Sequence, residues 1–143
     1  MYKHRFLICG LTVLLGGLLL SGCNSGDTTS SSSSSVADNI AQLLATNECE
    51  GCDLSGADLS NSNLRSAKLS YADLSDVKLA HSDLYRADLY FANLKGANLE
   101  KVDLYGANLK GALTKKTNMA GTILCNTIMP DGHVENRDCM VRE

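Results

Sequence analysis

The sequence predicts an all-β solenoid, a β-helix, because leucine recurs at every fifth position for twelve consecutive steps from Leu54 to Leu109. A small or β-branched residue stands two places before each leucine, and Asp, Asn or Lys stands between the two. A period of five matches neither the 3.6-residue period of an α-helix nor the two-residue period of a flat strand. The chain must therefore turn a corner every five residues, so that each leucine returns to one interior axis.

Residues 1–22 are expected to be a signal peptide that is absent from the mature protein. A basic start with Lys3 and Arg5 precedes an uncharged, mostly apolar run over residues 6–20, and two small residues follow before Cys23. The run has 15 residues, whereas a membrane-spanning helix needs about 20. It therefore has the length of a signal sequence rather than that of a transmembrane helix.

The four residues Leu20-Ser21-Gly22-Cys23 resemble a bacterial lipobox, whose cysteine is acylated and becomes the mature N-terminus. The resemblance implies that Cys23 carries fatty-acyl chains such as palmitate, and that the membrane is a partner of the protein through this anchor. The expected location is the cell envelope. In a Gram-negative host, Asn24 after the cysteine implies the outer membrane, on its periplasmic side or at the surface.

Residues 23–35 are predicted to form a lipid-anchored, flexible tether. The stretch after the cysteine contains six consecutive serines, at residues 30–35, and no apolar side chain. Such a composition buries too little surface to offset the entropy of ordering the chain. The tether would hold the folded part clear of the lipid.

Residues 36–51 and 130–143 are expected to cap the two ends of a β-helix that runs over residues 52–129. At the N-terminal end, Asp38 is predicted to be the N-cap of a short helix. At the C-terminal end, residues 129–132 have the composition of a turn. The apolar face of the predicted helix comprises Val36, Ile40, Leu43 and Leu44.

Four cysteines remain once Cys9 leaves with the signal peptide and Cys23 takes lipid. Four cysteines in an exported chain suggest two disulfides, for which three pairings exist. About four coils, each rising about 4.8 Å, would separate the first two cysteines from the last two, and a disulfide needs Cα atoms closer than about 7 Å. The distance argues against a four-cysteine zinc site and favours Cys49–Cys52 and Cys125–Cys139.

The spacing of Cys49 and Cys52 also fits a thiol–disulfide redox motif, in which a neighbouring group lowers the pKa of one thiol. Such motifs usually open a helix in a βαβ unit. Here Cys52 occupies the small-residue position of the first repeat. A structural disulfide is therefore the favoured interpretation, and redox exchange is the alternative.

The repeat strongly resembles that of pentapeptide-repeat proteins, as in Ala57-Asp58-Leu59 and Ala107-Asn108-Leu109. The strict match covers residues 52–113, and Thr114 then stands where a leucine would fall. A degraded but in-register pattern continues through residues 117–129. The resemblance implies a right-handed quadrilateral β-helix, in which four repeats make one coil.

If four repeats make one coil, residues 20 positions apart stack on one face, and the aromatic residues of the repeats gather on two adjacent faces. They form a candidate binding face for an envelope protein or a glycan. The alternative is that stacked rings only stabilise neighbouring coils. The aromatic residues concerned are Tyr71, Tyr85, Tyr90, Phe91 and Tyr105.

No catalytic, cofactor or metal site is expected. Beyond the signal peptide the only histidines are His81 and His133, and neither stands in a recognisable nucleophile–base arrangement. The chain has 13 basic and 16 acidic residues, and loss of Lys3 and Arg5 with the signal leaves 11 against 16, a charge of −5. An acidic, exported protein is not expected to bind nucleic acid.

These observations together predict a non-enzymatic, lipid-anchored envelope protein that acts as a rigid scaffold or protein-interaction module. The alternatives are a redox protein that uses Cys49 and Cys52, and glycan binding on the tyrosine face. Some pentapeptide-repeat proteins mimic DNA and inhibit gyrase. That activity is disfavoured here because those proteins act in the cytoplasm, whereas this chain carries an export signal.

Overall fold

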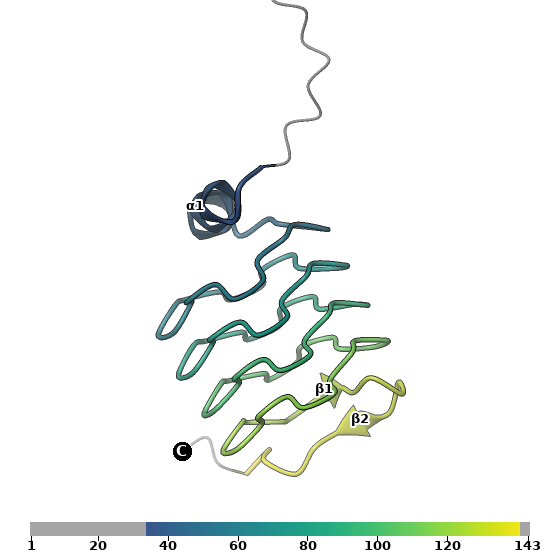
Figure 1. The fold of residues 1–143 in the computed structure, drawn as a ribbon. Helices are drawn as coiled ribbons and strands as arrows, with labels where there is room; N and C mark the ends of the chain where they lie inside the picture. Colours follow the sequence, from purple (N-terminus) through teal and green to yellow (C-terminus); the bar gives the residue numbers. More distant parts are fainter. Residues whose placement is uncertain (1–33, 141–143) are drawn as a thin grey trace, which may run out of the picture. The chain divides into compact units, whose positions relative to one another are not determined.

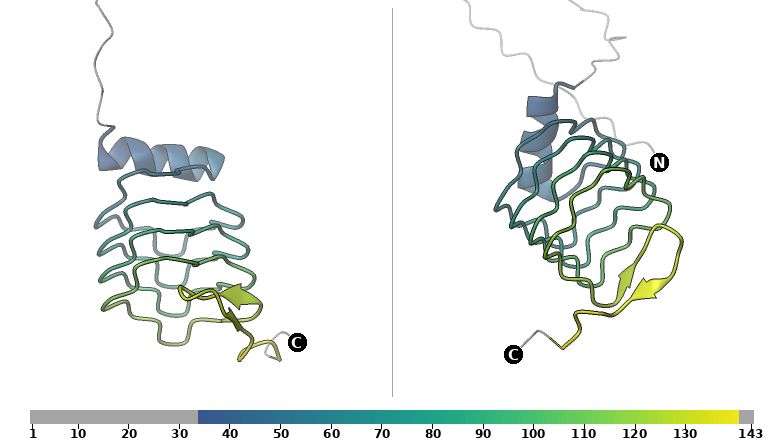
Figure 2. Two further views of the ribbon diagram at one scale, coloured as in Figure 1. Left: turned by 90° about the vertical axis from the view of Figure 1, so that its right-hand side faces the viewer. Right: turned by 60° about the horizontal axis from the view of Figure 1, so that its bottom comes forward.

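The computed structural model describes residues 34–140, which form a stack of coils closed at both ends. The predicted signal peptide, the lipid-attachment residue Cys23 and residues 24–33 of the predicted tether lie outside the described residues. The regular elements are the helix α1 (Val36–Thr46) and two short strands, β1 (Thr127–Ile128) and β2 (Val134–Glu135). The coils lie between α1 and the strands (Figures 1 and 2).

The coils are joined by single-residue parallel β-bridges between residues 20 positions apart, from Glu48↔Lys68 to Asn108↔Ile128. At one bridge the Leu54 amide donates to the Asp73 carbonyl and the Asp73 amide donates to the Cys52 carbonyl, both at 2.8 Å. Because four five-residue units fill each interval of 20 residues, one turn of the chain has four sides. The bridges stay isolated because the chain turns again before a longer strand can form.

A tight turn at the corner of each unit sets this geometry. The Ala57 amide donates to the Leu54 carbonyl at 3.1 Å, and between them Gly56 has a φ of +66°. A positive φ at the third residue of a turn is the mark of type II. The same corner position holds Tyr71 with φ 61° and Phe91 with φ 53°. Corner side chains therefore point away from the core and toward solvent.

The leucines fill the interior, as their period predicts. Eleven of the twelve are fully buried, and Leu59 is 2 % exposed. The bridge register begins at Glu48, four residues before the predicted start at residue 52. Cys49 therefore occupies an interior position one coil before Leu69 and is fully buried. The first coil thus has a sulfur atom where later coils have a leucine side chain.

Three threonines occupy the small-residue position in the last coil, and the hydroxyl of each is hydrogen-bonded. The hydroxyl of Thr117 donates to the Leu94 carbonyl at 2.6 Å, and the hydroxyl of Thr127 donates to the Leu104 carbonyl at 2.8 Å. Thr122 makes the same bond to Leu99 at 3.1 Å. Each bond reaches the coil before, so these threonines support the degraded end of the repeat.

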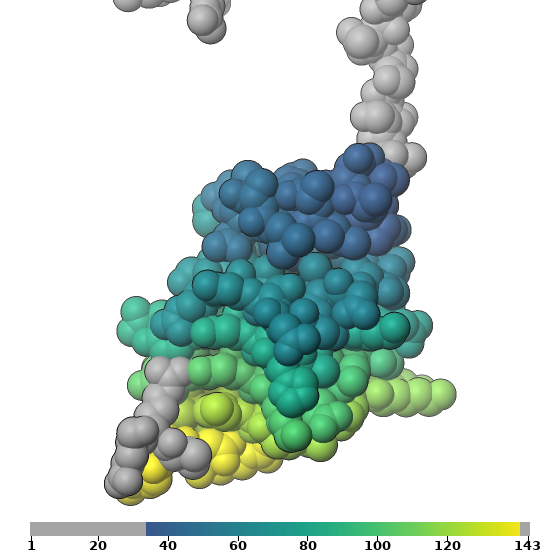
Figure 3. All heavy atoms as spheres, turned by 90° about the vertical axis from the view of Figure 1, so that its left-hand side faces the viewer, coloured from purple at the N-terminus to yellow at the C-terminus, as the bar shows by residue number. Residues whose placement is uncertain are grey.

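The helix α1 lies across the first coil and covers it (Figures 1 and 3). Its N-cap is Ser35 and not Asp38, so the predicted N-cap is wrong. The Ser35 hydroxyl accepts a bond from the Asp38 amide, and the Asp38 carboxylate accepts one from the Ser35 amide. This reciprocal arrangement is a capping box, in which the serine precedes the first turn and the acid closes it.

The apolar face of α1 also differs from the prediction at one residue. Leu43 is fully buried, and Val36 and Ile40 pack against the core, but Leu44 is 55 % exposed. One residue corresponds to about 100° around a helix, which turns Leu44 away from the coil below. Asn39 is also buried, and it donates from its side-chain amide to the Asp53 carbonyl at 2.8 Å.

The C-terminal segment folds back on the last coil. Strands β1 and β2 pair antiparallel, with Ile128 opposite Val134. The Asp138 carboxylate accepts hydrogen bonds from the Leu124 amide at 3.0 Å and the Arg137 guanidinium at 3.1 Å. The Leu124 bond is the main cause that lowers the pKa of Asp138 below its usual value. The segment thereby covers an edge that would otherwise be an open template for pairing.

The buried leucines should carry the stability of the stack. We expect Leu84→Ala, at a fully buried position, to lower the free energy of unfolding by about 2–5 kcal/mol, because it leaves a cavity in a narrow core. Leu113→Ala is the matched control, since Leu113 is 49 % exposed, and it should lower the free energy by about 0.5 kcal/mol or less. Chemical denaturation measures both values. Equal losses would contradict this assignment of the core.

The C-terminal segment should be sensitive to acid. The pKa of Asp138 is lowered from 3.8 in the folded state, so its stabilising effect is present above pH 3.8 and is lost as the pH falls through the folded pKa. We expect Asp138→Asn to reduce the melting temperature at pH 6, and the difference from wild type to shrink toward pH 2. Glu50→Gln, at an exposed position, is the charge-matched control. A difference that persists at pH 2 would rule out this role of the carboxylate.

Candidate functional site

The structure divides the five predicted aromatic residues into two clusters. The first, called the Tyr71 cluster, contains Tyr71, Tyr90 and Phe91. The rings of Tyr71 and Phe91 are parallel, with centroids 5.9 Å apart and an interplanar angle of 10°. The Tyr90 ring packs edge-on against both, at 5.7 Å from Tyr71 and 4.6 Å from Phe91. The stacking follows from the 20-residue register, which places Tyr71 and Phe91 on neighbouring coils.

The backbone holds the Tyr71 cluster open to solvent. Tyr71 and Phe91 occupy corner positions and are 63 % and 50 % exposed. The Phe91 ring rests on Gly111 of the next coil, where an added Cβ would come within 2.9 Å of three ring atoms. Glycine at residue 111 therefore makes room for the Phe91 ring. The rings form an exposed apolar surface whose arrangement is already fixed.

The second cluster, called the Tyr85 cluster, lies on the adjacent face. The Tyr85 and Tyr105 rings are stacked with centroids 5.2 Å apart, and the Arg65 guanidinium lies 4.2 Å from the Tyr85 centroid. Arg65 also pairs with Asp83 at 2.8 Å, and this hydrogen bond is the main cause that raises the pKa of Arg65. Tyr85 is therefore sandwiched between a cation and a ring, and it is less exposed than Tyr71.

Both disulfides that the sequence favours are present, one near each end of the stack. Cys49 and Cys52 are joined with Cα atoms 5.3 Å apart, and Cys125 and Cys139 with Cα atoms 4.8 Å apart. Cys49 is fully buried within the core that includes Leu43 of α1. The first disulfide thus fixes the start of the first coil, and the second ties the C-terminal segment to the last one.

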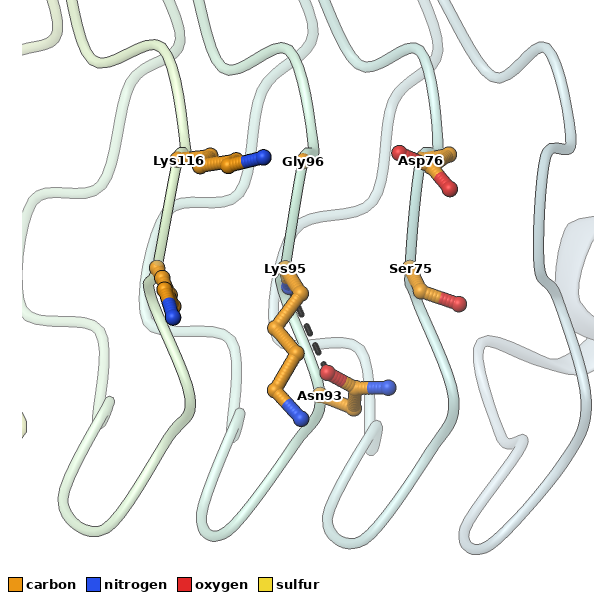
Figure 4. A pocket seen from close by; sticks show the side chains of 7 residues that line it. Ser75, Asp76, Asn93, Lys95, Gly96 and Lys116 are labelled. Carbon is orange, nitrogen blue, oxygen red and sulfur yellow. Dashed lines mark hydrogen bonds between the residues drawn. The ribbon is translucent and has the colours of Figure 1, made fainter.

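An open groove of about 540 Å³ on another face was not identified from the sequence (Figure 4). Its position could have been found from the register, which stacks Lys95 on Lys115 and places Gly96 between Asp76 and Lys116. We call it the lysine groove. The residues that line it are Ser75, Asp76, Asn93, Lys95, Gly96, Lys115 and Lys116.

His81 and His133 are both exposed. His81 is an exposed corner residue, and His133 contacts the Asp131 carboxylate. The hydrogen bond from the His133 amide is the main cause that lowers the pKa of Asp131. Within residues 34–140, no group of three or more His, Cys, Asp or Glu side chains is placed to hold a metal ion. In the same part of the chain, no helix has the length and apolar character to cross a membrane.

Comparison with known proteins identifies the repeat. A family model described as pentapeptide repeats matches residues 48–80 and 82–113 in eight copies. The crystal structure of alr5209, a pentapeptide repeat protein from Nostoc PCC 7120, is 32 % identical with a TM-score of 0.59, and the match covers 75 % of this chain and 91 % of that one. No curated protein matches.

Two further solved structures are more distant. AT2G44920, a pentapeptide repeat protein from the Arabidopsis thaliana thylakoid lumen, is 26 % identical with a TM-score of 0.42 over 69 % of this chain and 75 % of that one. HetL from Nostoc sp. strain PCC 7120 is 31 % identical with a TM-score of 0.30 over 62 % of this chain and 51 % of that one. The family model and the likeness to alr5209 imply a right-handed quadrilateral β-helix, with which the 20-residue bridge register agrees.

Proposed function

This chain belongs to the pentapeptide-repeat family, and from that premise we propose that it is a non-enzymatic, lipid-anchored scaffold of the cell envelope that binds a partner protein through the Tyr71 cluster. The anchor would be Cys23. The serine run from residue 30 leads into α1 at Ser35, so the stack would be tethered by its N-terminal end. In a Gram-negative host the expected location is the outer membrane.

The exposure of Tyr71 and Phe91 is the observation that carries the partner assignment. Tyr71 is 63 % exposed and Phe91 is 50 % exposed, so both rings leave apolar area in contact with water. Their parallel stack also restricts the rings before any partner binds, so little side-chain entropy remains to be lost on association. Aromatic residues of this kind are enriched at the centres of protein interfaces.

The filled interior of the described part supports a protein that binds its partner at the surface. Within residues 34–140 no buried side-chain nitrogen or oxygen lacks a hydrogen-bond partner. The leucine column fills the interior, and α1 and the C-terminal segment lie at its two ends (Figure 2). Because the interior is filled, a partner would bind to side chains on the outer surface of the coils and not in an internal cavity.

The redox alternative gains no support from the geometry. Thiol–disulfide exchange requires a thiolate to reach one sulfur of the disulfide. Cys49 is fully buried and Cys52 is half-buried beside it. Glycan binding on the aromatic face remains an alternative, because sugars also pack on exposed aromatic rings. The crosslinking experiment described below distinguishes a glycan from a protein partner.

The lipid anchor can be tested by metabolic labelling with palmitate. We expect wild type and Cys9→Ser to incorporate the label and to fractionate with membranes, whereas Cys23→Ser should do neither, because only Cys23 stands at the lipobox position. Cys9 is the matched control since it lies within the predicted signal peptide. Labelled Cys23→Ser protein, or unlabelled wild type, would refute the anchor.

The partner surface can be tested by crosslinking in intact envelopes, followed by binding measurements with the purified captured protein. We expect Tyr71→Ala/Phe91→Ala to weaken binding at least about tenfold, because it removes the exposed centre of the apolar surface. Tyr85→Ala/Tyr105→Ala is the matched control and should weaken binding less than about threefold. Thermal unfolding checks that both variants fold.

Two outcomes would overturn the assignment. Unchanged binding by Tyr71→Ala/Phe91→Ala would exclude the Tyr71 cluster as the recognition surface. If wild type captures a glycan and Tyr71→Ala/Phe91→Ala no longer does, the Tyr71 cluster binds carbohydrate and not a protein.

A further inference from the structure

The lysine groove carries positive charge that the described protein does not neutralise. Lys95, Lys115 and Lys116 line the groove, and none of them forms an ion pair with any residue between 34 and 140. Three of the four other lysines on the coils are paired, at 2.7 Å for Lys68–Glu48, 3.8 Å for Lys78–Asp58 and 3.9 Å for Lys101–Glu100, and Lys110 is the fourth. The groove therefore gathers three of the four lysines within residues 34–140 that form no ion pair, on a protein whose overall charge is −3.

The register brings two of these cations onto neighbouring coils. The Gly96 amide donates to the Lys115 carbonyl at 3.0 Å, so the backbone that follows Lys95 lies directly against Lys115. Like charges opposite one another on paired strands are destabilising. Elsewhere the same 20-residue spacing places Lys68 beside Glu48 and Lys78 beside Asp58, although it also pairs Asp53 with Asp73 and Asp83 with Asp103. An anion bound between Lys95 and Lys115 would remove the repulsion.

Glycine keeps the middle of the groove open. The Lys116 and Asp76 side chains extend toward Gly96 from the coils on either side (Figure 4), and a Cβ at residue 96 would overlap the Asp76 carboxylate. Ser75 and Asn93 add polar side chains to the lining. Three ammonium groups and one carboxylate leave a net positive charge over an opening of about 540 Å³, which exceeds the size of a single small anion.

We propose that the lysine groove binds a ligand with two or more linked phosphate groups. Lysine ammonium groups are compact point charges that commonly bind phosphate. Several such charges spread along an open groove match linked phosphates better than one isolated phosphate. The Asp76 carboxylate repels the ligand at one end and so limits the stretch of groove that the phosphates occupy. This proposal is independent of the partner surface at the Tyr71 cluster.

Calorimetric titration of the full chain in detergent with tripolyphosphate tests the proposal. We expect wild type to bind tripolyphosphate more tightly than inorganic phosphate, with an affinity that falls as ionic strength rises. Lys95→Gln/Lys115→Gln/Lys116→Gln should weaken binding at least about tenfold, because each lysine supplies a charge-assisted contact. Lys78→Gln/Lys101→Gln/Lys110→Gln removes the same charge from outside the groove and should weaken binding no more than about twofold.

A second kind of variant should strengthen the binding of tripolyphosphate instead of weakening it. Asp76→Asn removes the repelling carboxylate, keeps a side chain suited to the positive φ of 54° at this corner, and should tighten binding about twofold to fivefold. Thermal unfolding checks that each variant folds. Three results would overturn the proposal: no binding by wild type, equal weakening by the two triple variants, or binding that Asp76→Asn leaves unchanged or weaker.

Discussion

The corner residue with positive φ, two places after each interior leucine, is the constraint on which every coil depends. It lets the next amide return to the leucine carbonyl, as Ala57 does to Leu54, and it points the following small residue back toward the core. Where the corner is not glycine, as at Tyr71 and Arg86, the left-handed backbone costs about 1–2 kcal/mol. Burial of the leucines offsets this, at about 1.5–3 kcal/mol for each side chain. The repeated turn and the repeated leucine therefore stabilise each other.

The same constraint separates the surface from the core. Corner side chains project outward, so their identity can change with little effect on the leucine column. Residues at equivalent positions of successive coils stack in a column on the surface. Neighbours in such a column are 20 residues apart in the sequence. The Tyr71 cluster follows Leu69 and Leu89, and the lysine groove follows Leu74 and Leu94. The two surfaces thus lie on consecutive sides of the coils.

The ends of the stack need different solutions, because a repeat cannot cover itself. At the start, α1 places Leu43 over the first coil, and Cys49 takes an interior position. At the other end, threonine hydroxyls bond to carbonyls of the preceding coil, and the Cys125–Cys139 disulfide holds the return segment. The middle coils therefore stay uniform. Irregular structure is restricted to the two end coils, which have a neighbouring coil on one side only.

The sequence by itself determined the solenoid and the leucine core, because both follow from spacing along the chain, and it favoured the two disulfides. The 20-residue stacking interval came from the resemblance of the repeat to pentapeptide-repeat proteins. Only the tertiary structure decided that Ser35 caps α1, that Leu44 faces solvent and that Cys49 lies inside the first coil. It also divided the aromatic residues into an exposed Tyr71 cluster and a cation-covered Tyr85 cluster, and it revealed three lysines around one groove that form no ion pair within residues 34–140. Spacing specifies which backbone positions become neighbours. The rotamers, hydrogen bonds and charge partners of the side chains depend on neighbours across the coils, and a period of five does not encode them.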